Sequence, residues 1–129
     1  MEELGGPAVG GFGFAAGLDR LVLSLPAAEA AGAGPDVFIA CLGESAWERG
    51  MVMVRDLRRR GLWVEWEPTP GRSLKAQSRR ADRLGARYLA FLGDDELRKG
   101  TLTLKVLAGG EQREIPAADL DALAKELAR

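Results

Sequence analysis

The stretch Val37-Phe38-Ile39-Ala40-Cys41-Leu42 is a run of six apolar residues. It has the length of a β-strand and carries no charge, as expected of a strand that is buried on both faces of a parallel sheet. Parallel neighbours need a crossover connection, which is usually a helix. This run therefore predicts an α/β fold built around one central strand.

The residues that follow predict the first helix. Ser45 and Glu48 have the spacing of a capping box, and the arginines before Gly61 are typical of a helix C-terminus. Apolar residues recur between these ends at helical spacing. We expect this helix to bury Trp47, Met51, Val54 and Leu57.

The same alternation continues to the end of the chain. The patterns predict strands at 62–66, 87–92, 101–107 and 112–115, and helices at 73–84 and from Pro116 onward. The helix-linked strands imply parallel pairs, and the hairpin at Gly109-Gly110 adds antiparallel strands. The expected fold class is α/β, with a mixed, mostly parallel sheet of about five strands flanked by about three helices.

The N-terminal part has a different composition. Residues 26–35 are small, bracketed by prolines and without periodicity, which is typical of a linker. Before the linker, residues 11–25 are expected to form a glycine-rich strand that turns into a helix. We therefore divide the chain into residues 1–25, a linker at 26–35, and a domain at 36–129.

The composition excludes several classes of function. The chain contains no histidine, which excludes Ser-His-Asp and Cys-His catalysis and most zinc sites. Cys41 lies alone in an apolar run and is interpreted as a small core residue. The acidic run Asp94-Asp95-Glu96 is interpreted as a solvated or helix-starting turn, so no metal site is expected. Without a membrane-spanning apolar run or a signal peptide, the protein is expected to be cytoplasmic, with no membrane partner.

A basic stripe is the main candidate binding feature. Lys75, Arg79 and Arg83 are four residues apart, so they share one face of the predicted helix. A solvated outer face is the alternative reading of any such stripe. However, ligands of α/β sheets favour the carboxyl ends of the strands, where the loops at 43–44, 67–72 and 93–96 are expected. A basic face beside these loops suits an RNA backbone, with bases read by the loops.

The tryptophans are possible stacking platforms for bases. Trp47 lies in the apolar helix stripe and is interpreted as core. Trp63 and Trp66 point to opposite faces of their strand, so one of them is expected to be less buried. The residues alone leave open which one it is.

Residues 10–21 contain a second candidate site. The segment Gly13-Phe14-Ala15-Ala16-Gly17-Leu18-Asp19-Arg20-Leu21 follows Gly10-Gly11-Phe12 and reads as a tight turn into a helix. It is not a Walker loop, because no Gly-Lys-Ser/Thr follows. Its spacing leaves two readings open, a purely structural turn or a site where Arg20 holds a phosphate.

This segment resembles motif 3 of the class II aminoacyl-tRNA synthetases. The flanking Leu4-Gly5-Gly6-Pro7 and Val22-Leu23 resemble the histidyl branch of that family. The resemblance implies that Arg20 contacts the phosphates of ATP and that Gly17 borders its adenine.

A second resemblance covers residues 36–129. The runs that carry it are Gly71-Arg72-Ser73-Leu74-Lys75-Ala76-Gln77, Ala81-Asp82-Arg83-Leu84-Gly85-Ala86-Arg87-Tyr88 and Leu92-Gly93-Asp94-Asp95-Glu96-Leu97. They are similar to the anticodon-binding domain of histidyl-tRNA synthetases. The candidate tRNA-binding residues are Glu67, Arg72, Ser73, Lys75, Gln77, Arg79 and Arg83.

The two resemblances imply the C-terminal portion of a histidine–tRNA ligase. The parent enzyme would use ATP with magnesium to attach histidine to its tRNA. The implied partners are histidine-specific tRNA, the catalytic domain and a second copy of the parent in a homodimer. Val106 departs from the family, which commonly has an acidic residue after the lysine. The alternative is a stand-alone or regulatory paralogue that acts as an RNA- or protein-interaction module without catalysis.

We expect the 129-residue chain not to activate histidine on its own. Motif 1, motif 2 and both histidine-recognition segments of the family are absent from it. Acyl activation requires ATP and the amino acid to be positioned together, which one arginine cannot achieve, so no cofactor is expected for this chain alone. Histidine-dependent ATP–pyrophosphate exchange should stay at background, and a rate above background would contradict the expectation.

Overall fold

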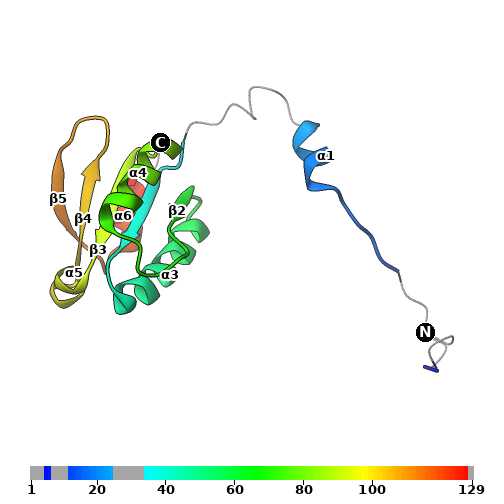
Figure 1. Ribbon diagram of the computed structural model, residues 1–129, viewed down its shortest axis with the longest axis horizontal. Helices are drawn as coiled ribbons and strands as arrows, with labels where there is room; N and C mark the ends of the chain where they lie inside the picture. Colours follow the sequence, from blue (N-terminus) through cyan, green and yellow to red (C-terminus); the bar gives the residue numbers. More distant parts are fainter. Residues whose placement is uncertain (1–4, 7–11, 25–33, 128–129) are drawn as a thin grey trace. The chain divides into compact units, whose positions relative to one another are not determined.

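The computed structural model describes residues 5–6, 12–24 and 34–127, and the chain divides into two units, residues 1–32 and 33–129 (Figure 1). In the first unit, helix α1 spans Leu18–Leu23. The expected strand before it is not observed at residues 12–16, which pair with no other described segment. A strand needs a partner for its backbone groups. Residues 1–4, 7–11, 25–33 and 128–129 lie outside the described residues, and they include most of the predicted linker and the predicted end of the first element.

The second unit contains one five-stranded sheet. Its strands are β1 (Val37–Cys41), β2 (Val64–Trp66), β3 (Tyr88–Leu92), β4 (Thr101–Val106) and β5 (Gln112–Pro116), in the order β2-β1-β3-β4-β5. β1 is parallel to β2 and β3, whereas the pairs β3–β4 and β4–β5 are antiparallel. The mixed five-stranded sheet is confirmed, but "mostly parallel" is wrong, because each kind of pairing occurs twice.

Four helices accompany this sheet, where about three were expected. They are α3 (Glu44–Arg59), α4 (Leu74–Leu84), α5 (Asp94–Lys99) and α6 (Leu120–Leu127). The additional helix is α5, which begins in the acidic run, so the helix-starting reading of that run is confirmed. It is too short to show an apolar period, and its extent was not predicted. The connection that contains α5, residues 93–100, is shorter than the crossover that a parallel strand would need. β4 therefore pairs with β3 in the antiparallel direction. Within the described ranges, no helix has the length and apolar composition that crossing a bilayer requires.

The core lies on both sides of β1, whose five residues are all buried. Val37, Ile39 and Cys41 belong to the larger cluster, which includes residues of α3 and α6. Phe38 and Ala40 belong to a smaller cluster with Ala81 of α4 and residues of β3. The predicted central strand, buried on both faces, is thus confirmed. It places α4 on one side of the sheet and α3 with α6 on the other.

The ends of several elements differ from the prediction. α3 begins at Glu44 and not Ser45, because Gly43 precedes it at φ 94°, in a region that favours glycine, and no side chain caps the helix. The Ser45–Glu48 capping box is therefore wrong. Pro116 ends β5, and the last helix begins only at Leu120. These are shifts at element boundaries, where local sequence signals are weakest.

The buried face of α3 also differs in one position. Val54 and Leu57 are buried and Trp47 packs partly against the core, as expected, but Met51 is 47% exposed. Gly50 and Met53 face inward in its place. Gly50 lies so close to β1 that a Cβ added there would overlap Sγ of Cys41.

We predict that Gly50→Ala destabilises the domain because of this overlap. Overpacking costs about 1–3 kcal/mol, of which the better helix propensity of alanine offsets up to about 1 kcal/mol. Urea unfolding should show the loss in the wild-type background and no loss in a Cys41→Ala background, where the sulfur is gone. An equal loss in both backgrounds would show that the sulfur contact is not the cause.

Candidate nucleic-acid interface

Helix α4 has well-defined ends that fix which residues face outward. Ser73 precedes it in an extended conformation, and its Oγ accepts the backbone N–H of Ala76 at 3.3 Å. Gly85 ends it at φ 67°, in the left-handed region. The predicted end at Leu84 is confirmed, and the helix begins one residue after the predicted start, with Ser73 as its N-cap. The Ser73 hydroxyl, a candidate RNA contact, thus has an internal role as the helix cap.

The two faces of α4 have opposite character. Gln77 and Ala81 are buried against the sheet. Lys75, Arg79 and Arg83 are exposed. In the described part of the chain, none of the three forms an ion pair. The predicted basic stripe therefore exists as a free cationic face.

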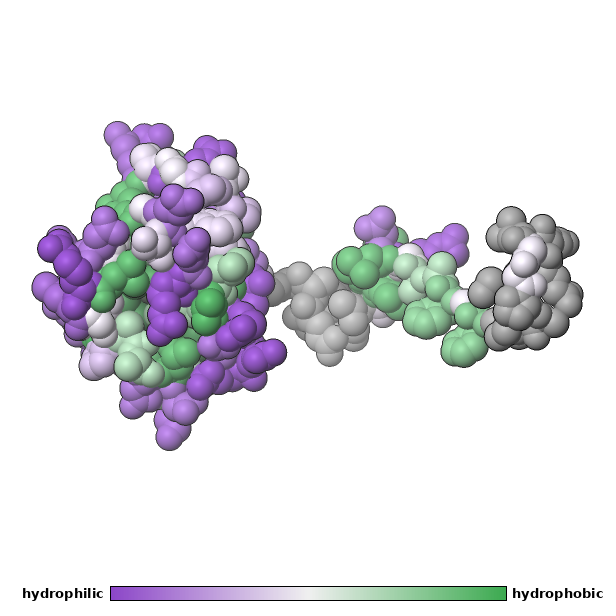
Figure 2. Space-filling view, turned by 90° about the horizontal axis from the view of Figure 1, so that it is seen from below, coloured by the Kyte–Doolittle hydropathy of each residue, from purple (hydrophilic) through white to green (hydrophobic). Residues whose placement is uncertain are grey.

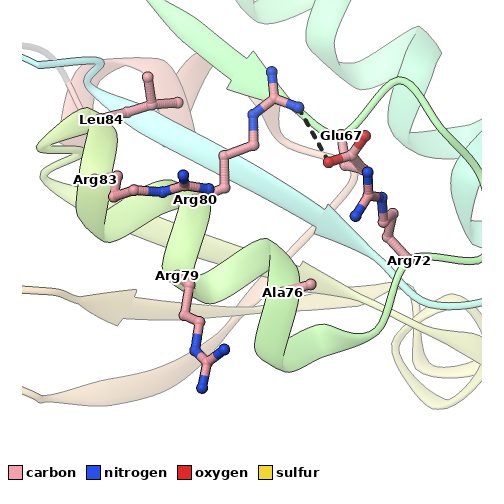
Figure 3. A pocket seen from close by; sticks show the side chains of 7 residues that line it. All are labelled: Glu67, Arg72, Ala76, Arg79, Arg80, Arg83 and Leu84. Carbon is pink, nitrogen blue, oxygen red and sulfur yellow. Dashed lines mark hydrogen bonds and ion pairs between the residues drawn. The ribbon is translucent and has the colours of Figure 1, made fainter.

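A depression of about 540 Å³ lies beside this face. Arg72, Arg79, Arg80 and Arg83 line it together with one carboxylate, that of Glu67; Ala76 and Leu84 complete the lining (Figure 3). In Figure 3 the guanidinium group of Arg79 points away from those of Arg72 and Arg80. Because these arginines are spread along α4 and the loop before it, the surface suits an extended polyanion better than one small anion.

The carboxylate of Glu67 is fixed within this surface. Its Oε2 accepts a hydrogen bond from Nη1 of Arg80 at 3.1 Å, and its Oε1 accepts one from the backbone N–H of Thr69 at 3.1 Å. Burial by itself would raise the pKa of Glu67, but the bonds from Thr69 and Arg80 outweigh it and hold this pKa below its usual 4.5. Glu67 therefore stays ionised near neutral pH, and in the described part of the chain Arg80 is the arginine of this depression that forms an ion pair.

Gln77 corrects the list of candidate contacts. It is 2% exposed, and its side-chain amide bonds to backbone groups of Cys41 and Arg72. A ligand cannot reach it, so the expectation of a direct RNA contact does not hold for this side chain. The helical spacing in the sequence already indicated this burial. Gln77 is two positions from both Lys75 and Arg79, so it lies on the opposite face of the helix.

The structure resolves the question left open for the tryptophans. Trp63 is 48% exposed, whereas Trp66 is half-buried and its ring centroid lies 5.2 Å from that of Trp47. Trp47 also donates its indole N–H to the carbonyl of Glu67 at 3.3 Å. Trp47 and Trp66 thus support the start of the loop at 67–72.

An open part of the sheet was not foreseen as a candidate surface. Phe91 of β3 is paired with Thr103 of β4, and Leu89 with Lys105, so these four share the face on which α4 packs. Among the described residues, α4 is the helix that packs on this side, and it packs mainly against β1. Phe91 and Lys105 are only partly buried. The alternation at 101–107 predicted a half-exposed strand, but not that Lys105 lies on the same face of the sheet as α4.

Three further candidates remain, which are Cys41, the pair Gly17 and Arg20, and the acidic run Asp94–Glu96. Cys41 is buried and burial raises its thiol pKa to about 11, so it is a core residue and not a nucleophile. Arg20 is exposed in the first turn of α1, and Gly17 is the residue that precedes that helix. Asp94, Asp95 and Glu96 form the first turn of α5. Within the described ranges, no three His, Cys, Asp or Glu side chains are arranged so that they could hold a metal ion.

Comparison with known proteins identifies the family. Residues 36–127 match the family described as "Anticodon binding domain". The chain belongs to this anticodon-binding domain family. The match implies that the domain binds tRNA, and it covers β1 to α6, including the whole of α4 and its depression.

The relatives are histidine–tRNA ligases, whose C-terminal part this chain matches. The enzyme of Trichlorobacter lovleyi is 45% identical over 115 residues, which cover 89% of this chain and 27% of the ligase. That of Geobacillus thermodenitrificans is 42% identical over 126 residues, covering 93% of this chain and 29% of the ligase. The chain thus spans less than a third of the length of these relatives.

Solved structures agree with the sequence matches. Apo histidyl-tRNA synthetase of S. aureus superimposes with a TM-score of 0.65 at 29% identity, over 85% of this chain and 28% of that one. The histidyl-tRNA synthetase of Nostoc sp. PCC 7120 gives a TM-score of 0.63 at 29% identity, over 86% and 26%. The α/β fold of the anticodon-binding domain is therefore shared with these synthetases.

We predict that the contribution of Glu67 to stability depends on pH. Its native pKa is lowered, so its stabilising effect is fully present above the unfolded value near 4.5 and is lost as the pH falls through the native pKa. Glu67→Gln should cost about 1–2 kcal/mol at neutral pH, because Arg80 and the Thr69 N–H lose a charged acceptor.

Urea unfolding from pH 7 to pH 3 measures this effect. The difference in free energy of unfolding between wild type and Glu67→Gln should disappear as the pH drops below about 4.5. Glu111→Gln, at an exposed position, is the control, and its free energy of unfolding should stay close to that of wild type at every pH. A gap for Glu67→Gln that is the same at every pH would contradict the role of its charge.

Proposed function

We propose that this anticodon-binding domain recognises histidine-specific tRNA and that α4 holds the RNA backbone. The observation that carries the proposal is the free cationic face of Lys75, Arg79 and Arg83 beside the arginine-lined depression. Successive stripe residues are about 6 Å apart along the helix axis, at 1.5 Å per residue. This row of cations suits consecutive phosphates of one strand.

The bases would be read at the carboxyl ends of the parallel strands. Three loops meet this edge of the sheet, after β1 at 42–43, after β2 at 67–73 and after β3 at residue 93. The loop at 67–73 leads directly into α4, so a backbone held on α4 passes beside it. Loop groups can meet base edges and therefore supply sequence preference, which phosphate contacts cannot. Partly exposed Phe91 offers a stacking surface on the open part of the sheet.

We also propose that the first unit belongs to the catalytic domain of a longer, cytoplasmic histidine–tRNA ligase that acts as a homodimer. Phe12, Phe14 and Leu18 are 97%, 91% and 76% exposed, and no residue of α1 is buried. Figure 2 shows mostly hydrophobic residues along this segment, with hydrophilic residues on one side of it. Such a surface needs cover from further protein. There, Gly17 and Arg20 would border an ATP site, where exposed Arg20 can hold a phosphate of magnesium-bound ATP.

Charge reversal tests the RNA-binding face. Lys75→Glu, Arg79→Glu and Arg83→Glu together should weaken binding of a histidine-tRNA transcript more than tenfold. They should also lower the slope of log affinity against log salt by about 2–3, because fewer counterions are released. Fluorescence anisotropy over a salt series measures both, with circular dichroism to confirm folding.

The matched control carries the same change of charge on the opposite layer. Arg49→Glu, Arg59→Glu and Lys125→Glu alter exposed residues of α3 and α6. This variant should keep most of the wild-type affinity. Its slope of log affinity against log salt should stay closer to the wild-type slope than that of the α4 variant. Equal losses in both triple variants would show that net charge and not the α4 face governs binding. No loss in the α4 variant would show that the stripe is a solvated surface.

A further inference from the structure

The central strand β1 extends beyond its neighbour β2. β2 pairs with Val37, Phe38 and Ile39 of β1 and then ends, so no strand residue faces Cys41 on that side. The side-chain amide of Gln77 fills this position. Its oxygen accepts the N–H of Cys41 at 3.0 Å, and its nitrogen donates to the carbonyl of Cys41 at 2.8 Å. The amide thus bonds to β1 as the peptide group of a neighbouring strand would.

The same amide also holds the end of the adjacent loop. Its nitrogen donates a second hydrogen bond, at 2.8 Å, to the carbonyl of Arg72. A glutamine amide has two N–H donors, and both are used here at a position that is 2% exposed. The backbone conformation of Arg72 is therefore tied to β1 through one buried side chain.

The start of this loop is held independently. The carbonyl of Glu67 accepts the indole N–H of Trp47, and its carboxylate accepts Arg80 and the N–H of Thr69. Pro68 and Pro70 restrict the backbone between the two ends. The loop at 67–72 is therefore pinned at both ends. A loop that is already ordered loses less conformational entropy when it binds a ligand.

We propose that Gln77 is a positioning residue for tRNA recognition. By holding the Arg72 carbonyl, it fixes the loop at 67–72 and the exposed Arg72 side chain in the conformation that receives the RNA. Gln77 itself touches no ligand. The proposal rests on the function proposed above, and its test separates the two.

Gln77→Glu is the informative variant because it keeps the size of the side chain. It removes both N–H donors and places an oxygen against the carbonyls of Cys41 and Arg72. Trypsin cleaves after arginine, so the Arg72–Ser73 bond reports directly on the order of the loop. Under native conditions, cleavage there should be at least tenfold faster than in wild type, relative to cleavage after Lys99.

Ala81→Gly is the matched control. Ala81 lies one turn further along the same buried face of α4, and glycine weakens the helix there without touching the loop. This variant should lower the thermal midpoint, yet leave cleavage after Arg72 within twofold of wild type. If Gln77 only stabilised the fold, the two variants would show the same relation between the lowered thermal midpoint and the rate of cleavage after Arg72.

Binding of a histidine-tRNA transcript, and of the same transcript with altered anticodon bases, completes the test. Gln77→Glu should lower the affinity for the first at least threefold and reduce the preference over the second, while Ala81→Gly keeps both. Unchanged cleavage after Arg72 in Gln77→Glu would overturn the bracing role. Faster cleavage with unchanged affinity and preference would overturn the link to recognition. Failure of the wild type to bind either transcript would overturn the proposed function, whatever the cleavage rates.

A measurement on the wild type covers the case in which Gln77→Glu does not fold. The side-chain amide protons of Gln77 should exchange slowly with solvent by NMR. The NMR order parameters of the backbone at 67–72 should stay the same after the transcript is added, as expected of a loop ordered beforehand. Fast exchange of the Gln77 protons, or order of this loop gained only with RNA, would overturn the proposal.

Discussion

The burial of β1 on both faces is the constraint on which the rest of the structure depends. A strand with apolar residues on both faces requires a layer on each side, and α3 and α4 supply these layers immediately after β1 and β2. Side chains hold both of its ends. Asp36, just before it, accepts the N–H of Trp63 at 2.9 Å and an N–H of Arg87 at 3.4 Å. Gln77 closes the other end, where β2 no longer runs beside it.

The same constraint creates the basic surface. Because α4 must turn Gln77 and Ala81 toward the sheet, its remaining positions face solvent, and these carry the lysine and arginines. The net charge of the whole chain is -1, but many of its acidic groups are engaged elsewhere. Asp56 pairs with Arg55, Asp121 with Arg60, and Glu114 with Lys99. A nearly neutral chain therefore presents one face of uncompensated positive charge, which suits a domain that must meet RNA on one side only.

Much of the fold could be read from local patterns. Periodicity or a capping residue indicated the type of three elements, which are the strand at 37–42, the strand at 101–107 and the helix at 73–84. Shorter elements lacked such a signal. α5 has six residues and no buried side chain, so the acidic run gave no apolar period to detect. The start of α3 was displaced by one residue because Gly43 takes a backbone conformation that the Ser45–Glu48 pattern does not reveal.

The sequence by itself determined the class of fold, the family resemblance and the existence of a cationic helix face, because these follow from spacing along a single element. The tertiary structure decided what each candidate side chain does. Gln77 and Lys75 stand two residues apart in one motif, yet one is buried in bonds to β1 and the other is free. Likewise, Glu67 is committed to Arg80, thirteen residues away in the chain. The partners of a buried polar group come from other elements, and only the packed fold brings those partners within hydrogen-bonding distance.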